Sequence, residues 1–460
     1  MNLTVFILFI FGLQIICLIT SRKYSKGLKN QEDYFLAGKT IRFFPLMMTF
    51  LATQVGGGLI LGSAEEAYQF GWSVLFYPLG ASLGLLVLGL GIGRRLAQFQ
   101  VSTVAQIFEV VYRSPKLKKV ASIFSIVSLF LVLVAQIVAS NKFMISLGVE
   151  NQIWFLAFWG IVIIYTALGG LKAIVATDIV QAAFFIVAFL LCFGYAIYSA
   201  ENSFVQIIEI GLTNESFSFD STKLLGWLLM PMIFIVIGQD MGQRCFAADS
   251  PRTVSRATLW AAVCTMVISV IPVFFGVYAR TMNIDVPEGA SVLITVIKQT
   301  TTPLITALAG CAILAAIIST ADALINAIGS NLSQDFGYSF LKKDNIRFSQ
   351  IIAVIISITA IFFSFYNKNI VDLLILSYDL SVSCLFVPII IALYKRQGNV
   401  LSAGLAIAFG ALSFVLFRIF PTELPKEILT IAFSFLGFGL GEMVMLKRNQ
   451  RIKQGITIYD

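Results

Sequence analysis

Residues 51–68 read LATQVGGGLILGSAEEAY and place three consecutive glycines, Gly56, Gly57 and Gly58, inside a long apolar stretch. Each glycine costs a helix about 1 kcal/mol relative to alanine. Backbone groups that leave a helix at membrane depth cannot face lipid, so broken backbone survives there only where protein or a wet cavity covers it. Transporters use such breaks to bind ions and substrates. We therefore expect an interrupted membrane helix here; the alternative is close helix packing through small residues.

The composition indicates an all-α membrane protein. Of 460 residues, 58% are hydrophobic and only 12% are charged, and the mean hydropathy is +0.90. Soluble proteins carry about twice that charged fraction. The apolar residues extend along the whole chain, so we expect residues 1–460 to form one polytopic domain. The start, MNLTVFILFIFGLQIICLIT, has no basic residue before its apolar run and no small-residue cleavage site, which predicts a retained first helix.

About thirteen apolar segments are long enough to cross about 30 Å of hydrocarbon. They cover residues 2–20, 43–70, 72–93, 119–140, 152–168, 173–199, 225–243, 257–278, 302–328, 348–366, 370–394, 399–418 and 427–446. Lys and Arg concentrate between alternate segments, as in 22–42, 94–119 and 244–256, and in the tail after Leu446. The positive-inside rule then predicts a plasma-membrane protein with its amino terminus outside and its carboxyl terminus in the cytoplasm. The net charge of +8 thus reflects topology, and we expect no nucleic-acid partner.

The residues of catalysis and metal binding are scarce. The six cysteines are scattered without metal-ligand spacing, which predicts neither a disulfide nor a metal cluster. The chain has no histidine, which removes His-based acid–base catalysis and the commonest transition-metal ligand. No nucleophile–base pair is evident in the sequence. We therefore expect a protein that is not an enzyme and has no cofactor.

The order of the segments suggests an internal repeat. The segment 225–243 carries Pro231 and Gly238 and lies five segments after the glycine-broken one. A five-helix repeat places its second copy upside down, and an inverted pair whose first helices are both interrupted is typical of a transporter site. The expected division is an extra helix and inner loop (1–41), repeat 1 (42–199), repeat 2 (225–394), and two last helices with a cytoplasmic tail (399–460).

The helix expected at 302–328 offers oxygen ligands. Ala316, Ser319 and Thr320 stand at i, i+3 and i+4 and share one face. A small hard cation such as Na⁺ needs about five or six oxygens, and the carbonyls of Ala52 and Val55 beside the broken helix are candidates for the rest. The alternative is that the two hydroxyls bond back to carbonyls of their own helix.

Acidic residues inside membrane segments form a second group. Asp178 lies in GGLKAIVATDIVQ (169–181), one to two turns inside its helix, and Asp322 follows the hydroxyl pair. An intramembrane carboxylate is a functional hypothesis by default. The alternatives are a structural role for Asp178 with Thr177, and contact of Asp322 with cytoplasmic water. The other intramembrane polar residues are Gln54, Glu65, Glu66, Gln136, Gln181, Gln239, Asp240 and Asp379.

Four stretches together resemble the sodium/solute symporter family over essentially the whole chain: DYFLAGK (33–39), GGLKAIVATDIVQ, QRCFAADSPR (243–252) and ISTADAL (318–324). The resemblance implies a LeuT-type fold, which is an inverted pair of five-helix repeats with one helix before and two after. It also implies Na⁺-coupled uptake by alternating access.

Carried over from the family, the Na⁺ ligands are the carbonyls of Ala52, Val55 and Ala316 and the hydroxyls of Ser319 and Thr320. Some members hold a second sodium with the Asp of the TD pair and further serines. Here Asp178 is kept, but Asp322 and Ala323 occupy the positions of those serines, which leaves a second ion or proton site open.

The resemblance says less about the solute. Gly58 and Leu59 replace the polar pair of the sugar carriers, and 52–68 is most similar to the choline-transporter branch. Gln54 and Gly238 stand where that branch has two tryptophans of its aromatic cage. A small organic solute such as an amino acid remains. Its candidate contacts are Gln54, Gly56, Gly57, Gly58, Gln136 and Gln239.

Two other functions stay open. Proton coupling would use Asp178, Asp322 or Asp379. A membrane sensor would use the same fold as an input domain, although the tail after Leu446 is short. The expected partners are a small solute, Na⁺ and the lipid bilayer, with no obligate protein partner.

Overall fold

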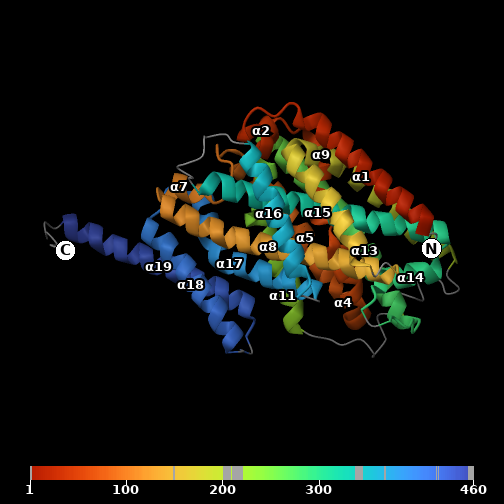
Figure 1. The fold of residues 1–460 in the computed structure, drawn as a ribbon. Coiled ribbons are helices and arrows are strands. Elements are labelled where there is room, and N and C mark those ends of the chain that lie inside the picture. The colour runs from red at the N-terminus through yellow and green to blue at the C-terminus, as the bar shows by residue number, and fades with distance from the viewer. Residues whose placement is uncertain are drawn as a thin grey trace.

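The computed structural model is all-helical, apart from one isolated bridge between Ile41 and Ala248, in the residues it describes. These are residues 3–148, 151–199, 209, 221–287, 289–336, 346–366, 369–420, 422 and 424–453. Within them ten helical stretches are long and apolar enough to cross a membrane, or up to eleven with one bent pair as a single span. The helices pack into one bundle, with α18 and α19 at its edge (Figure 1). The all-α membrane class is confirmed.

Most helices coincide with the apolar segments. The principal ones are α1 (Leu3–Ser25), α3 (Phe43–Gln54), α4 (Ser63–Phe70), α5 (Phe76–Val87), α6 (Gly93–Ala97), α8 (Pro115–Ser146), α9 (Gln152–Ser199), α11 (Ser221–Ile237), α12 (Gln239–Ala247), α13 (Pro251–Thr281), α15 (Pro303–Asp335), α16 (Ile346–Ser364), α17 (Ile370–Lys395), α18 (Val400–Ile419) and α19 (Lys426–Lys453). Three short helices were not anticipated: α2 (Gln31–Leu36), α7 (Gln106–Tyr112) and α14 (Val292–Thr300). The helices α8, α13 and α15 begin with a Ser or Thr cap followed by proline.

The break at the glycines is present. α3 ends at Gln54, and Val55 leaves helical geometry with φ −86° and ψ 82°. The chain resumes as a π-helical turn over Gly58–Gly62 before α4. The flanking residues are buried, so the broken backbone is covered by protein. The glycines therefore mark an interruption, as expected.

A second interruption separates α11 from α12. The two helices are bent by 42° at Gly238, which has an extended conformation with φ −63° and ψ 138°. Pro231 lies within α11. Both segments that the sequence marked as broken are therefore broken.

The long helix α9 contains a third irregularity. Gly170 has φ 61° and ψ −173°, a conformation essentially restricted to glycine. The sequence analysis expected two separate segments here, 152–168 and 173–199. The structure joins the two halves across a kink in which Tyr34 O lies against the glycine.

The most enclosed spanning helix is α15. In its most apolar 18-residue window 83% of the residues are buried, more than in any other candidate span of the described chain. Its neighbours include α1, α8 and α9. Ser319 and Thr320 therefore lie on the central helix of the bundle.

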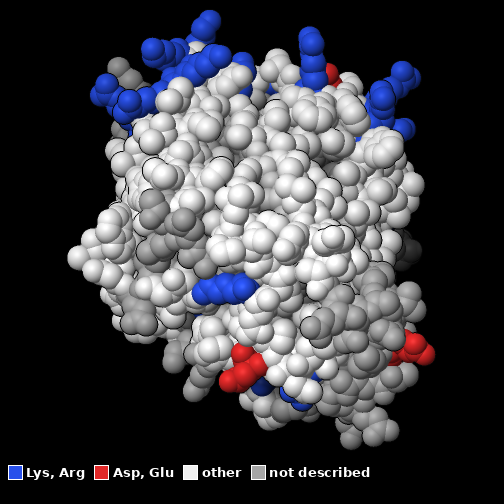
Figure 2. Space-filling model, turned by 90° about the vertical axis from the view of Figure 1, so that its right-hand side faces the viewer, with Lys and Arg blue, Asp and Glu red and all other residues white. Residues whose placement is uncertain are grey.

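Charge is distributed unevenly over the surface. Figure 2 shows Lys and Arg side chains gathered at the upper end of the molecule, above a broad band with few charged groups. The same end carries α2 in Figure 1. An uncharged band between polar ends is what a bilayer requires.

Replacing Gly170 by alanine should destabilise the protein. The φ/ψ values alone cost a residue with a Cβ about 1–3 kcal/mol, and the new Cβ would lie 2.6 Å from Tyr34 O. Thermal unfolding of the purified protein in detergent should show a lower Tm. Gly160→Ala in the same helix is the control, because no atom lies within 4 Å of its added Cβ. An equal fall in Tm for both variants would contradict the role assigned to the conformation of Gly170.

Candidate ion and solute site

Carbonyl and hydroxyl oxygens converge where α3 ends against α15. Ser319 Oγ lies 2.9 Å from Ala52 O and 2.9 Å from Ala316 O. Thr320 Oγ1 lies 3.3 Å from Ala52 O, 3.0 Å from Thr53 O and 3.2 Å from Ala316 O. The two hydroxyl side chains are buried. Helix α15 therefore presents both hydroxyls to the carbonyl end of the broken helix.

This oxygen cluster has more acceptors than hydrogens. Each hydroxyl supplies one hydrogen, yet Ser319 has two carbonyl oxygens within hydrogen-bond distance and Thr320 has three. The hydroxyls therefore lie within hydrogen-bond distance of a carbonyl of their own helix, Ala316 O, and also of carbonyls at the end of α3. The surplus lone pairs suit a hard cation that takes oxygen ligands.

The structure brings together four of the five residues selected as Na⁺ ligands, namely Ala52, Ala316, Ser319 and Thr320. The fifth, Val55, is buried one residue beyond α3. Thr53 O joins the cluster, although the sequence analysis did not select it. Its carbonyl is freed because α3 ends one residue later, and helix ends are uncertain by a residue or two in any sequence-based assignment.

The glycines allow close approach on the other side of the break. The Gly57 N–H donates to Gln136 Oε1 of α8 at 2.7 Å. A Cβ on Gly56 would lie 2.8 Å from the same Gln136 oxygen, and one on Gly57 would lie 2.6 Å from Ala139 Cβ. A Cβ on Gly58 would meet a methyl group of Leu374. The space left by the missing side chains is filled by neighbouring helices.

A small cavity of about 30 Å³ lies beside the break. That volume holds about two water molecules. Its lining consists of Thr53, Gln54, Gly56, Gly58, Leu59, Tyr77, Val132, Gln136, Phe234, Ile235, Asp240, Thr320, Leu324, Leu374 and Tyr378. Thr53 and Thr320 therefore belong to both the oxygen cluster and the cavity. Of the solute candidates, Gln54, Gly56, Gly58 and Gln136 line it.

Gln239 was selected as a solute contact, and the structure places its side chain elsewhere. Its Oε1 accepts from Val104 N at 2.7 Å and its Nε2 donates to Ser102 O at 3.3 Å. Gln239 therefore anchors the segment between α6 and α7. The next residue, Asp240, lines the cavity instead. The bend at Gly238 decides which of the two faces the break.

Asp178 belongs to a buried charge network with Arg244. Thr49 Oγ1 donates to Asp178 Oδ2 at 2.5 Å, and Arg244 Nη2 lies 3.6 Å from the same oxygen. Arg244 Nε donates to Thr49 Oγ1 at 2.9 Å. The sequence analysis assigned Arg244 to a cytoplasmic loop; it is instead fully buried, and it joins α12 to α3 and α9. Asp178 is thus paired with an arginine.

Asp322 lies on α15 one turn beyond the oxygen cluster and is fully buried, not in contact with cytoplasmic water. The Thr166 hydroxyl of α9 donates to its Oδ1. Its Oδ2 has no hydrogen-bond partner. No Lys or Arg of the described residues forms an ion pair with it. Asp178 and Asp322 therefore differ, since only the first has a cationic partner.

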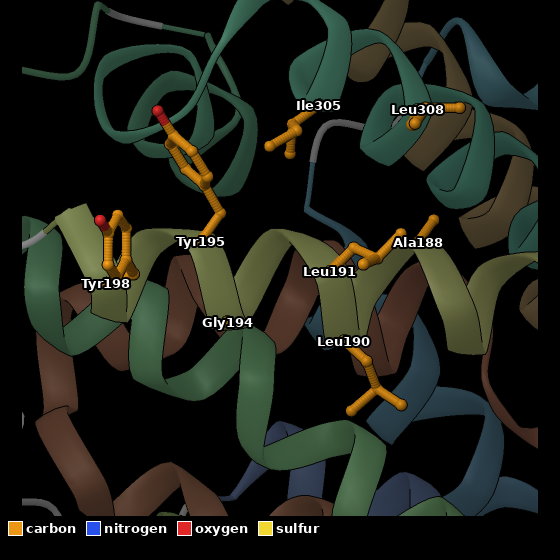
Figure 3. A pocket seen from close by; sticks show the side chains of 8 residues that line it. All are labelled: Ala188, Leu190, Leu191, Gly194, Tyr195, Tyr198, Ile305 and Leu308. Atoms are coloured by element: carbon orange, nitrogen blue, oxygen red, sulfur yellow. The ribbon is translucent and has the colours of Figure 1, made fainter.

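Larger hollows lie away from the break. One, of about 540 Å³, is lined by charged residues that include Glu66, Lys223, Asp372 and Arg418. Asp379, which was considered for proton coupling, is paired with Arg418 at 3.0 Å. Figure 3 shows another hollow, an apolar one between Leu190 and Leu191 of α9 and the first turns of α15. Both leucines are about half exposed on the bundle surface, where acyl chains lie against a spanning helix.

The many apolar helices and the two interrupted spans define a multi-pass membrane protein of the kind that transporters form. The chain superposes on the solved structure of a Na⁺-coupled sialic acid symporter in a substrate-bound outward-open state, with a TM-score of 0.78 and 16% identity. The match covers 95% of this chain and 97% of that chain.

The chain belongs to the sodium:solute symporter family, whose model matches residues 34–410. It is similar to the sodium/proline symporter of Haemophilus influenzae, with 26% identity over 394 residues, 78% of this chain and 76% of the relative. It is also similar to the sodium/pantothenate symporter of that organism, with 22% identity over 99% of this chain and 98% of the relative. The protein is therefore a Na⁺-coupled symporter and not an enzyme.

The network around Arg244 gives a stability prediction. Arg244→Met leaves Asp178 as an unpaired buried charge, and breaking a buried pair in this way costs about 3–5 kcal/mol. The single variant should lower Tm strongly, and adding Asp178→Asn should restore part of the loss because residue 178 then carries no charge to be compensated. Thermal unfolding of the two single variants and the double variant measures the coupling. Strictly additive losses would show that the pair does not act as a unit.

Proposed function

We propose that Na⁺ is bound at the junction of α3 and α15 by Ala52 O, Val55 O, Ala316 O, Ser319 Oγ and Thr320 Oγ1, with Thr53 O beside them. The observation that carries the proposal is the surplus of oxygen acceptors over hydrogens in this buried cluster. A cation at its centre replaces the competing hydroxyl bonds with direct contacts to the same oxygens.

Coupling between Na⁺ and solute binding follows from the residues that the ion site and the cavity share. Thr53 and Thr320 belong to the oxygen cluster and also line the cavity. Binding of Na⁺ fixes the orientation of both and so shapes the wall that a solute meets. Ion and solute then favour the same conformation, and by linkage each raises the affinity for the other.

The solute is a small organic molecule that binds beside the break, with Gln54, Gly56, Gly58 and Gln136 as contacts. Gly57 acts through Gln136, which accepts its N–H. The cavity of about 30 Å³ is too small for such a molecule, so binding requires α17 to move Leu374 away from Gly58. The solutes that name the relatives, proline and pantothenate, are suitable first probes.

The transmembrane topology that we propose has thirteen spans in a plasma membrane. α9 has 48 residues, which is about 72 Å of helix and more than twice the hydrocarbon thickness. The glycine at its kink, Gly170, divides it into two spans. The run Gly58–Ala97 has 40 residues and is divided in the same way at Gly71, which has φ 64°.

Thirteen spans divide the chain into four parts: an extra helix and inner loop (1–41), repeat 1 (42–199), repeat 2 (225–394), and the last two helices with the tail (399–460). The broken helices α3–α4 and α11–α12 then open the two inverted repeats. The gathering of Lys and Arg at one end supports a cytoplasmic location for that end (Figure 2). The amino terminus is then outside and the carboxyl terminus is in the cytoplasm.

A second cation site at Asp322 is also proposed, with Asp178 as its electrostatic neighbour. Asp178 is compensated by Arg244, whereas Asp322 has no ion pair among the described Lys and Arg residues. A buried carboxylate without a cation is costly. Either Na⁺ or H⁺ satisfies it, so proton coupling remains the second candidate function at this residue.

The Na⁺ site is tested by removing its hydroxyls. Ser319→Ala or Thr320→Ala should raise the Na⁺ concentration for half-maximal stabilisation at least about tenfold, because a contact between a hydroxyl and a charge is worth about 1.5–3 kcal/mol. Na⁺-dependent thermal shift in detergent measures this without a known solute. Ser330→Ala is the control, since Ser330 is buried on the same helix and its Oγ has no hydrogen-bond partner. An unchanged Na⁺ requirement in both test variants would show that the site is misassigned.

The second cation is tested with Asp322→Asn in proteoliposomes. The wild type should respond to Na⁺ with a Hill coefficient above one if both cations are Na⁺. If the second is H⁺, the coefficient should be near one and an inward pH gradient should enhance uptake. The variant should lose whichever response the wild type shows, because its amide carries no charge. A variant indistinguishable from wild type in both responses refutes a cation at Asp322.

A further inference from the structure

The cavity at the break has a single charged residue in its lining, Asp240. Asp240 is the second residue of α12, directly after the bend at Gly238. The residue is 5% exposed, and its Oδ1 has no hydrogen-bond partner. A Cβ on Gly238 would lie 2.6 Å from this oxygen, so the glycine leaves room for the carboxylate beside the bend.

The nearby arginine is committed to other groups. Arg244 Nη1 donates to the main-chain oxygen of Asp240 at 2.9 Å. Its Nε donates to Thr49, and its Nη2 lies 3.6 Å from Asp178. Among the described residues no Lys or Arg forms an ion pair with the Asp240 carboxylate. The ion pair of Arg244 is thus with Asp178, and the carboxylate of Asp240, which lines the cavity, has no direct cationic contact.

The rest of the cavity wall suits an organic cation. The rings of Phe234 and Tyr378 lie with centroids 4.5 Å apart and planes 33° apart, and both residues line the cavity. Tyr77 contributes a third ring to the lining. Aromatic faces attract ammonium groups, and this attraction is stronger where water is excluded. A carboxylate beside aromatic rings offers a positively charged nitrogen both an ion pair and cation–π contacts.

We propose that Asp240 is the counter-ion of an ammonium group on the transported solute, and that Phe234, Tyr77 and Tyr378 enclose that group. The solute class is therefore a small amine, an amino acid or a quaternary ammonium compound. A carboxylate that lacks a cationic nitrogen, such as pantothenate, is disfavoured because it would place a second negative charge beside Asp240. This inference rests on the proposed solute site beside the break.

Matched pairs of compounds test the inference on the wild-type protein. Proline is compared with cyclopentanecarboxylate, which keeps the ring and the carboxylate and lacks the nitrogen. Choline is compared with 3,3-dimethylbutan-1-ol, a neutral analogue of the same shape. Thermal shift of the full chain in detergent with Na⁺ present should show stabilisation by at least one ammonium compound and by neither analogue.

A charge-removing variant gives a second test. Asp240→Asn keeps the shape of the side chain and should weaken binding of the stabilising ammonium compound by about ten- to a hundredfold. Asp249→Asn makes the same chemical change at an exposed position and should leave the affinity unchanged. Stabilisation by Na⁺ alone should persist in both variants, which shows that they are folded.

The outcomes separate this inference from the function on which it rests. If Na⁺ stabilises the wild type but an analogue shifts Tm as much as its ammonium partner, the inference fails and the ion site stands. Stabilisation by pantothenate or another solute without a cationic nitrogen, or by no ammonium compound at all, overturns it equally. If Na⁺ has no effect and Ser319→Ala changes nothing, the proposed ion site fails instead.

Discussion

The structure depends on how the backbone of the broken helix is satisfied in an apolar medium. A continuous helix pairs its own N–H and C=O groups, but the end of α3 leaves several without partners. Lipid offers them none. Side chains of two other helices supply them: Gln136 of α8 accepts the Gly57 N–H, and the Ser319 and Thr320 hydroxyls of α15 contact the carbonyls of Ala52 and Thr53. The break is therefore stable only while α3, α8 and α15 keep their relative positions.

This dependence links the fold to transport. The carbonyl end of α3 contacts the central helix α15, and the turn that follows contacts α17 through Gly58 and Leu374. The Na⁺ that we propose between α3 and α15 would strengthen the first contact. A solute beside the break must open the second, because the cavity there is small. On the proposed assignment, ion and solute therefore act on two different contacts of one interrupted helix, and discontinuous helices are where transporters of this kind place their sites.

The sequence predicted the parts of the site that depend on local periodicity. Ala316, Ser319 and Thr320 share a face because a helix repeats every 3.6 residues, and nothing interrupts α15 between them. At α12 no such periodicity was available, and Gln239 was selected only as a polar residue of the second interrupted segment. The bend at Gly238 rotates the residues that follow it, so Asp240 lines the cavity while Gln239 binds the segment 102–104. Helical spacing carries no information across a bend.

Arg244 shows a second limit. A count of basic residues treats every arginine near a helix end alike, so the sequence placed Arg244 in a cytoplasmic loop. Its burial against Asp178 and Thr49 is a tertiary contact between segments more than 60 residues apart, and no local pattern reports it. The intramembrane Asp178 was the one indication of this contact in the sequence, because a carboxylate buried in a membrane protein is usually paired with another group.

Charge compensation is the common basis of the cation sites proposed at Asp322 and Asp240. Asp178, Asp240 and Asp322 are all buried, and the ion pair of Arg244 is with Asp178. The two remaining carboxylates have no cationic side chain within ion-pair distance in the described chain. Such an arrangement is costly without bound cations and becomes favourable when they enter. On the two proposals, each cation that enters beside Asp240 or Asp322 lowers the cost of burying that carboxylate at membrane depth.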